Sequence, residues 1–400
     1  MITRRNSAEE DASVAYEANA QDVLIWADSE SDSDLYHATG FLVPDPLAYL
    51  ELNGEKVLLV RDLEYGRALR ESRVDRVVST TPYEEALRSE GKTPHPELII
   101  DRFLRDGPAR GASGSGRRFL VPERFPLGMA EKLRELGWRL AVREDPFFPE
   151  RTIKTDEEVG RIRRSQQDAE AAMERVRELL ARSAIRDGIL HIDGAPLTAE
   201  AVRFEALKLL LERGSIGLEM IVAGGEQGCD PHQRGSGPLP ANETIIVDIF
   251  PRSLETRYWG DITRTFVRGK ASGEVKRLYR DVLDAQELAL GLLRSGAEGQ
   301  AIHQAVTDFF TSRGDATEER DGRKTGFIHG TGHGVGLDIH ELPRMGKIGT
   351  RLEAGNVVTV EPGLYYPGVG AVRIEDLVVV TDDGHRSLTT FPKSLDTLEV

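Results

Sequence analysis

The 400-residue chain is poor in cysteine and in aromatic side chains, with Cys229 as its only cysteine and 6% aromatic residues. A single cysteine excludes an intrachain disulfide framework and a cluster of thiolate metal ligands. No apolar run approaches the roughly 20 residues that a membrane-spanning helix needs. The first 22 residues contain two arginines but no apolar stretch behind them, so they do not resemble a secretory signal. We therefore expect a cytoplasmic protein with no membrane partner.

Basic residues are also fewer than acidic ones: the chain has 52 Lys and Arg and 67 Asp and Glu, which gives a net charge of −15. Nucleic-acid binding depends mainly on Lys and Arg that displace counterions, so a nucleic-acid partner is not expected. The hydrophobic and charged fractions, 39% and 30%, are typical of a globular protein. At roughly 100 to 200 residues per domain, the length predicts more than one domain.

Two domains are predicted from the distribution of apolar runs. Residues 1–150 alternate short apolar runs with helical patches, which is typical of a mixed α/β domain. Pro146 and Pro149 then forbid a continuous helix. Residues 151–400 form the second domain, whose first helix starts at a capping box made by Thr155 and Glu158. Further amphipathic helices are expected at about 198–213, 272–294 and 299–312.

An internal repeat supplies the first sign of chemistry. Residues 239–248 and 352–361 share Leu-x-Ala, a polar turn, an apolar run and a terminal carboxylate, Asp248 or Glu361. Each unit is followed by a second acidic residue, Asp261 or Glu375. We therefore predict a duplication in which each half contributes one hairpin with two carboxylates.

A carboxylate at the end of an apolar strand must be paired, protonated or bound to a cation, because burying it alone costs several kcal/mol or more. Arg264 and Arg373 are possible ion-pair partners for one or two of these acids. Residues 327–341 concentrate three histidines among glycines, and imidazole adds a nitrogen donor to an oxygen-rich set. Four carboxylates and one imidazole suit two divalent ions that share bridging carboxylates, which predicts metal-assisted hydrolysis.

The segments 261–266, 329–340, 360–365 and 373–376 resemble the creatinase and aminopeptidase P family of "pita-bread" metallopeptidases, in its aminopeptidase P and prolidase branch. The resemblance implies an α+β fold class. Its C-terminal pita-bread domain would contain an internal pseudo-two-fold repeat, preceded by a smaller creatinase-type α/β domain. It also implies that two divalent metal ions are bound. We expect manganese because the site is rich in oxygen, with cobalt, zinc and iron as alternatives.

The resemblance also implies a role for each residue of the site. The implied metal ligands are Asp248, Asp261, His333, Glu361 and Glu375, with Asp261 and Glu375 as bridges. The implied catalytic residues are Glu361 as proton acceptor, and His232 and His340 at the scissile carbonyl and the leaving group. The implied substrate contacts are His329, Arg373 and Tyr365. Asp248 and Asp261 are thirteen residues apart, which predicts a hairpin loop two residues longer than is usual in the family.

The expected function is an Xaa-Pro peptidase, a metallo-exopeptidase that cleaves between an N-terminal residue and proline in peptides or dipeptides. The alternative is a catalytically silent pita-bread module that binds peptides or proteins, which the intact ligand set disfavours. A metal-free creatinase-like C–N hydrolase and a methionine aminopeptidase fit less well. Dipeptidase and aminopeptidase P activities both stay open. The acidic composition and the long loop at residues 252–257 favour an open site that accepts longer peptides as well as dipeptides. A homodimer is expected because two-fold association is the commonest oligomeric state.

Overall fold

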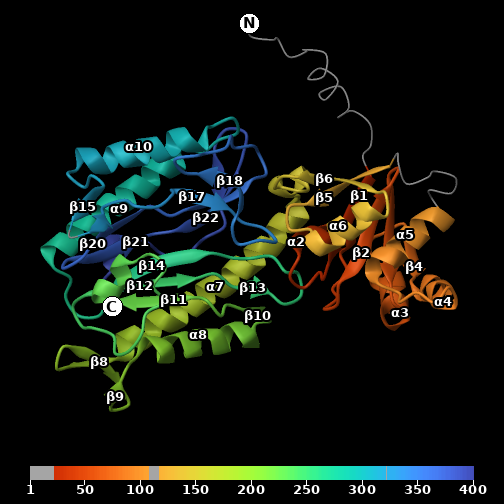
Figure 1. The fold of residues 1–400 in the computed structure, drawn as a ribbon. Coiled ribbons are helices and arrows are strands. Elements are labelled where there is room, and N and C mark those ends of the chain that lie inside the picture. The colour runs from red at the N-terminus through yellow and green to blue at the C-terminus, as the bar shows by residue number, and fades with distance from the viewer. Residues whose placement is uncertain (1–21, 108–116, 321) are drawn as a thin grey trace, which may run out of the picture. The chain divides into compact units, whose positions relative to one another are not determined.

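The computed structural model describes residues 22–107, 117–320 and 322–400. The N-terminal residues that suggested a cytoplasmic location lie almost entirely outside this part of the chain. The chain divides into two compact units, Met1–Pro149 and Glu150–Val400 (Figure 1). Over the described ranges, no helix combines the length and the apolar character that crossing a membrane requires.

The first unit contains a six-stranded sheet in the order β4-β3-β2-β1-β5-β6. β2 runs antiparallel to both of its neighbours and the other strands run parallel to one another. Separate apolar clusters cover the two faces of the sheet, which explains why its strands read as nearly continuous apolar runs. The strands are β1 Asp22–Ala27, β2 Leu47–Leu52, β3 Glu55–Val60, β4 Arg76–Ser79, β5 Arg118–Pro122 and β6 Arg139–Arg143. The helices are α2 Ser33–Thr39, α3 Asp62–Glu71, α4 Thr81–Ser89, α5 Pro96–Asp106 and α6 Leu127–Glu135.

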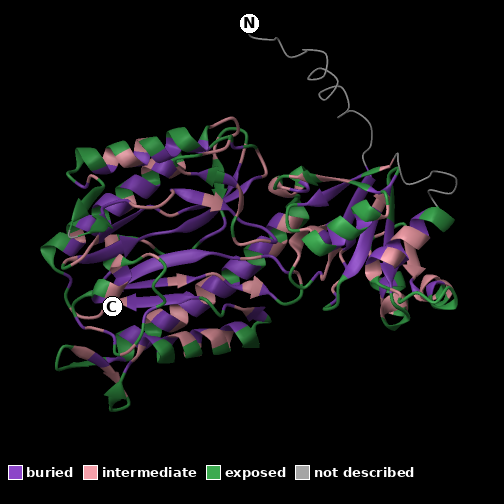
Figure 2. Cartoon of the chain, viewed as in Figure 1, coloured by how far each residue is buried: buried purple, intermediate pink, exposed green. Residues whose placement is uncertain are grey.

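The second unit is built on two pairs of helices, which flank its strands in Figure 1. The first pair is α7 Asp156–Arg182 and α8 Ala199–Glu212, and the second is α9 Gly273–Leu292 and α10 Gly299–Ser312. α7 begins at the predicted capping box, in which the Thr155 hydroxyl and the Glu158 carboxylate each accept the other residue's backbone N–H. Each pair packs its apolar face into its own core, whereas its outer surface is exposed (Figure 2). The predicted helices are therefore confirmed.

The strands between the helix pairs form two principal sheets. The first half contributes β11-β12-β14, with bounds Ile221–Gly224, Thr244–Ile249 and Ile262–Val267. The second half contributes β18-β17-β19-β22-β23, with bounds Glu341–Met345, Gly332–Gly334, Val357–Val360, Asp376–Val380 and His385–Ser387. A hydrogen bond from the Glu375 N–H to the Thr263 carbonyl, 3.1 Å long, joins the two halves.

Short elements complete the unit. The hairpin of β20 Gly363–Tyr366 and β21 Gly370–Arg373 lies between β19 and β22 in the sequence. The remaining strands are β7 Ala184–Arg186, β8 Ile189–Ile192, β9 Ala195–Pro196, β10 Ser215–Ile216, β13 Arg252–Ser253, β15 Glu318–Arg320 and β16 Arg323–Thr325. The 3-10 helices are η1 Pro149–Thr152, η2 Gly225–Cys229 and η3 Leu395–Thr397.

The two halves repeat one plan, a helix pair followed by an antiparallel strand pair. In the first half β12 pairs with β14, and Ile249 lies opposite Ile262. In the second half β19 pairs with β22, and Val360 lies opposite Asp376. This arrangement agrees with the duplication predicted from the repeated sequence pattern.

Candidate active site

The four repeated carboxylates come together where the two strand pairs meet. Asp248 lies in β12, and Asp261 directly precedes β14. Glu361 directly follows β19, and Glu375 directly precedes β22. Because the strands of each pair are antiparallel and in register at these positions, each half brings its two acids to the same end of the pair. Asp261 and Glu375 are buried, with 4% and 2% of their surface exposed.

His333 on β17 directs its ring toward these acids. Its Nδ1 lies 3.1 Å from the Gly334 carbonyl, which accepts the Nδ1 proton and leaves the Nε2 lone pair free. Nε2 lies 3.4 Å from a Glu361 oxygen and 3.7 Å from an Asp261 oxygen. Candidate ligand atoms of Asp261, His333 and Glu375 lie within 4.8 Å of one another.

The electrostatics of the cluster favour a cation. Burial and the neighbouring carboxylates raise the pKa values of Asp261 and Glu375 well above their usual range, and burial raises the pKa of Glu361 to about 7. Burial lowers the pKa of His333 to about 3, so the imidazole is neutral and able to act as a ligand. One oxygen of Asp248, Oδ1, is buried and accepts no hydrogen bond within the described part of the chain. Close carboxylates, a neutral imidazole and an unpartnered oxygen fit a divalent metal centre.

Arg264 and Arg373 were the possible ion-pair partners of the four acids, and together they neutralise only one of these acids. Arg264 is 1% exposed and pairs with Asp376, at 2.8 Å, rather than with one of the four acids. Arg373 pairs with Asp248, through Nη2 and Oδ2 at 2.7 Å. Ion pairing within the protein therefore does not account for Asp261, Glu361 and Glu375.

Metal-free protein should become less stable as pH rises from about 7 to 8.5. Burial raises the pKa of Glu361 to about 7, so at the start of this range its folded-state carboxyl still holds part of a proton that the unfolded chain, whose carboxyls titrate near pH 4, has released. The raised pKa values of Asp261 and Glu375, caused by burial and the neighbouring acids, act in the same direction. Each such proton lowers the free energy of unfolding by about 1.4 kcal/mol per pH unit. The lowered pKa values of His329 and His333 act in the opposite sense, but only below the usual histidine pKa of about 6.5.

Melting temperatures of EDTA-treated protein at pH 7 and 8.5 measure this effect. The same pair of measurements with saturating Mn²⁺ is the control, because bound cations keep the carboxylates ionised and remove the dependence. Equal pH dependence with and without Mn²⁺ would contradict the assignment of these acids to a cation site.

Arg373, Tyr365 and His329 form a buried chain of hydrogen bonds beside the acids. Arg373 Nη1 donates to the Tyr365 hydroxyl at 2.9 Å, and Nε donates to Thr263 Oγ1 at 3.2 Å. The Tyr365 hydroxyl lies 2.8 Å from His329 Nε2, while His329 Nδ1 lies 2.8 Å from the Gly330 carbonyl. Burial lowers the pKa of His329 to about 3, so the neutral ring accepts the tyrosine proton.

Arg373 is only 3% exposed, and its guanidinium is already engaged by three side chains. An open cation waiting for a substrate carboxylate would have free donors at the surface instead. The structure therefore shows Arg373 holding Asp248 and Tyr365 in place, and the substrate contact expected from the sequence stays a prediction.

His340 and His232 lie at more exposed positions. The rings of His340 and His333 are perpendicular, with centroids 4.3 Å apart, so His340 adjoins the cluster. His232 follows η2 on an exposed loop. Burial lowers the pKa values of both His329 and His340, and the neighbouring His232 adds to both shifts. The structure thus brings both histidines into the electrostatic range of the site.

Two threonines were missed by sequence reasoning. Thr263 Oγ1 donates to a Glu375 oxygen at 2.7 Å. Thr359 Oγ1 accepts the His333 backbone N–H at 3.0 Å and lies 3.3 Å from a Glu361 oxygen. Each threonine stands two residues from an acid, Asp261 or Glu361, and so occupies the same face of its strand. The two-residue spacing between each threonine and its acid is the sequence feature that could have identified them.

The long loop after Asp248 closes without displacing Asp261. The Gly260 N–H donates to the Pro251 carbonyl at 2.9 Å, which draws the two ends of the loop together. The Asp261 N–H donates to Gln166 Oε1 on α7 at 2.7 Å. The two additional residues are therefore accommodated within the loop.

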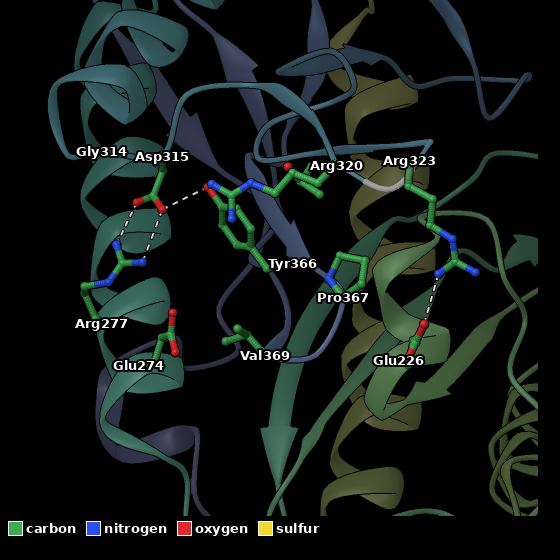
Figure 3. Close-up of a pocket in the computed structure, with 11 residues that line it drawn as sticks. Glu226, Glu274, Arg277, Gly314, Asp315, Arg320, Arg323, Tyr366, Pro367 and Val369 are labelled. Carbon is green, nitrogen blue, oxygen red and sulfur yellow. Dashed lines mark hydrogen bonds and ion pairs between the residues drawn. The ribbon is translucent and has the colours of Figure 1, made fainter.

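A cavity of about 480 Å³ in the second unit contains none of the predicted site residues. Figure 3 shows Tyr366 and Arg277 on either side of Asp315, and Arg323 reaching Glu226. Arg277 and Arg323 lie 2.8 Å and 3.0 Å from their acidic partners. Because its charges are balanced within the protein, this cavity lacks the uncompensated carboxylates that mark the cluster.

Comparison with known proteins agrees with this assignment. The model of metallopeptidase family M24 matches residues 160–382. The chain is 36% identical over 182 residues to an uncharacterized peptidase, YqhT, of Bacillus subtilis, a match that covers 45% of this chain and 49% of that protein. It is 27% identical over 350 residues to an Xaa-Pro dipeptidase of Pyrococcus furiosus, covering 87% of this chain and 88% of the relative. The chain thus spans about half the length of the first relative and most of the second.

A solved structure of a prolidase from Pyrococcus furiosus matches with a TM-score of 0.76 and 24% identity, covering 95% of this chain and 99% of that chain. This likeness confirms the predicted α+β pita-bread fold class. The family model covers more than half of the chain, including all five predicted metal ligands. The chain therefore belongs to metallopeptidase family M24.

Proposed function

We propose that this protein is an Xaa-Pro peptidase that uses two divalent metal ions to hydrolyse the bond between an N-terminal residue and proline. The observation that carries the proposal is the grouping of the buried acids Asp261 and Glu375 with Glu361 around His333, whose Nε2 is free to bind a cation. Asp248 adds its charge to the same cluster. Support for proline specificity comes from the Xaa-Pro dipeptidase of Pyrococcus furiosus, which aligns with 87% of this chain.

In this proposal the five residues of the cluster hold the ions, with Asp261 and Glu375 placed between the two halves. Bound divalent ions would supply Lewis acidity and a water molecule of lowered pKa. Glu361 would act as the proton acceptor, because its carboxylate lies 3.4 Å from His333 Nε2, among the residues that would hold the ions. The Glu361 side chain is 17% exposed, so it is accessible to a proton released on the side where the substrate would bind.

His340 and His232 act on the substrate. Burial lowers the pKa of His340, so its ring is neutral near pH 7 and can donate an N–H to the oxygen that becomes negative during cleavage. His232 stands on an exposed loop, where it can meet the leaving group. Tyr365 and His329 would line the position of the proline ring, and Arg373 keeps the Tyr365 hydroxyl in place.

Three finer assignments belong to the same proposal. Manganese is the proposed native ion because four of the five ligands are carboxylates. A cytoplasmic location and a homodimer are also proposed, on the sequence arguments given above. Metal analysis of protein purified without added metal and sedimentation of the native chain test the first and the last.

Substrate length is the sharpest test of specificity. We expect the Mn²⁺-loaded protein to hydrolyse Leu-Pro, Leu-Pro-Ala and Leu-Pro-amide with kcat/KM values within about 10-fold of one another. A free carboxylate that met an unpaired arginine would gain about 1.5–3 kcal/mol, but Arg373 is buried and already paired. Leu-Ala is the matched control and should be cleaved far more slowly.

A drop of a hundredfold or more for both the extended and the amidated substrate would instead indicate a strict dipeptidase. Equal rates on Leu-Ala and Leu-Pro would contradict proline specificity. Mn²⁺ binding without hydrolysis of any of these peptides would favour the silent binding module.

A further inference from the structure

Gln286, in the middle of α9, is completely buried and lies behind two of the proposed metal ligands. Its Nε2 donates to two backbone carbonyls, of Val360 at 2.9 Å and of Ile374 at 3.2 Å. These residues directly precede Glu361 and Glu375. One amide nitrogen therefore joins the two chain segments from which both glutamates project.

The other end of the amide is held as well. Gln286 Oε1 accepts a hydrogen bond from Lys393 Nζ at 2.7 Å, and the same ammonium pairs with Asp376 at 2.7 Å. An ammonium only donates and a carbonyl only accepts, so the amide has a single orientation that satisfies all of its neighbours. The side chain is thus fixed at both ends.

The first half of the unit contains a similar arrangement on α7. Gln166 is also completely buried, and its Oε1 accepts the backbone N–H of Asp261 at 2.7 Å. Its Nε2 donates to Thr389 Oγ1 at 2.9 Å. In each half, therefore, the first long helix uses one buried glutamine to hold the backbone beside a proposed ligand.

We propose that Gln286 is a positioning residue that sets the separation between Glu361 and Glu375, and through it the affinity of the metal centre. The inference rests on the proposed function, because it takes these glutamates as ligands. A helix is a rigid support, and two hydrogen bonds from one nitrogen restrain two carbonyls relative to each other. Residues that orient metal ligands typically change metal affinity by about 10- to 100-fold when they are removed.

The test is Mn²⁺ binding to Gln286→Met, measured by isothermal titration calorimetry on the full chain. Methionine keeps the length of the side chain and removes both donors, so the Mn²⁺ Kd should rise by about 10- to 100-fold. The matched control is Gln304→Met on α10, because Gln304 is exposed and, among the residues that the structure describes, its side chain bonds to Asp308 alone, at 2.8 Å. Its Kd should equal that of the wild type.

Melting temperatures with and without Mn²⁺ separate positioning from a general structural role. Positioning predicts a smaller Mn²⁺-induced increase in the Gln286→Met variant than in the wild type. A lower melting temperature with an unchanged Kd and an unchanged Mn²⁺-induced increase would overturn the proposal.

If Gln286→Met does not fold, Lys393→Met decides instead. This residue is partly exposed, and its loss frees the Oε1 end of Gln286 while both donors remain. A weaker Mn²⁺ affinity in this variant supports the proposal and wild-type affinity overturns it. A wild-type chain that binds no Mn²⁺ would refute the proposed function itself, which is a distinguishable result.

Discussion

Asp261→Asn should abolish hydrolysis and reduce bound Mn²⁺ to one ion per chain or none. Asp261 is buried close to His333 and Glu375, and its burial, together with the neighbouring acids Glu375, Asp248 and Glu361, raises its pKa. Asparagine has nearly the same shape but no negative charge, so the variant tests charge rather than packing. Residues that merely orient a ligand cost about 10- to 100-fold, so the loss of a bridging carboxylate should exceed about 10³-fold in kcat/KM.

Metal analysis of the purified variant together with kcat/KM on Leu-Pro measures both effects. Glu375→Gln should behave in the same way, since Glu375 lies across the joint between the halves. Asp382→Asn, an exposed residue in a turn, is the matched control and should retain metal and activity. Near-normal turnover in either site variant would rule out the two-metal assignment.

His333→Ala and His340→Ala should have different consequences although their rings are in contact. His333 offers a free Nε2 to the carboxylates, so alanine at this position should lower metal content and activity together. His340 is exposed and in the proposal acts on the substrate rather than on a metal ion, so His340→Ala should keep most of its metal and lose about 10²-fold or more in kcat.

Titration of each variant with Mn²⁺, followed by rates at saturating metal, distinguishes the two histidines. His191→Ala on β8 controls for the loss of an imidazole elsewhere in the same unit. Equal Mn²⁺ affinities in the two site variants would mean that the roles of ligand and substrate contact have been interchanged.

The meeting of the four acids was predictable because local sequence patterns specify where each acid lies. Asp248 and Glu361 each end an apolar run, and the repeated pattern around them predicts where the following acids, Asp261 and Glu375, lie. The helices were predictable for the same reason, since the capping box at Thr155 and the spacing of apolar residues are local properties.

The residues that hold the proposed ligands in place do so through contacts between residues that are far apart in the sequence. Arg373 pairs with Asp248, which lies 125 positions earlier, and no local sequence pattern predicts that pair. Its expected role as a substrate contact stays a prediction. Arg264 was a possible partner of the cluster and instead pairs with Asp376. Gln286 is one polar residue on an amphipathic helix, and only the packed structure reveals the two carbonyls that it binds.

The duplicated strand pairs are not chemically equivalent. In the second half β17, which pairs with β19, carries His333, whereas in the first half β11, which pairs with β12, carries only the apolar sequence Ile221–Gly224. His333 thus has no counterpart on β11, and this difference gives the two sides of the site unequal chemistry.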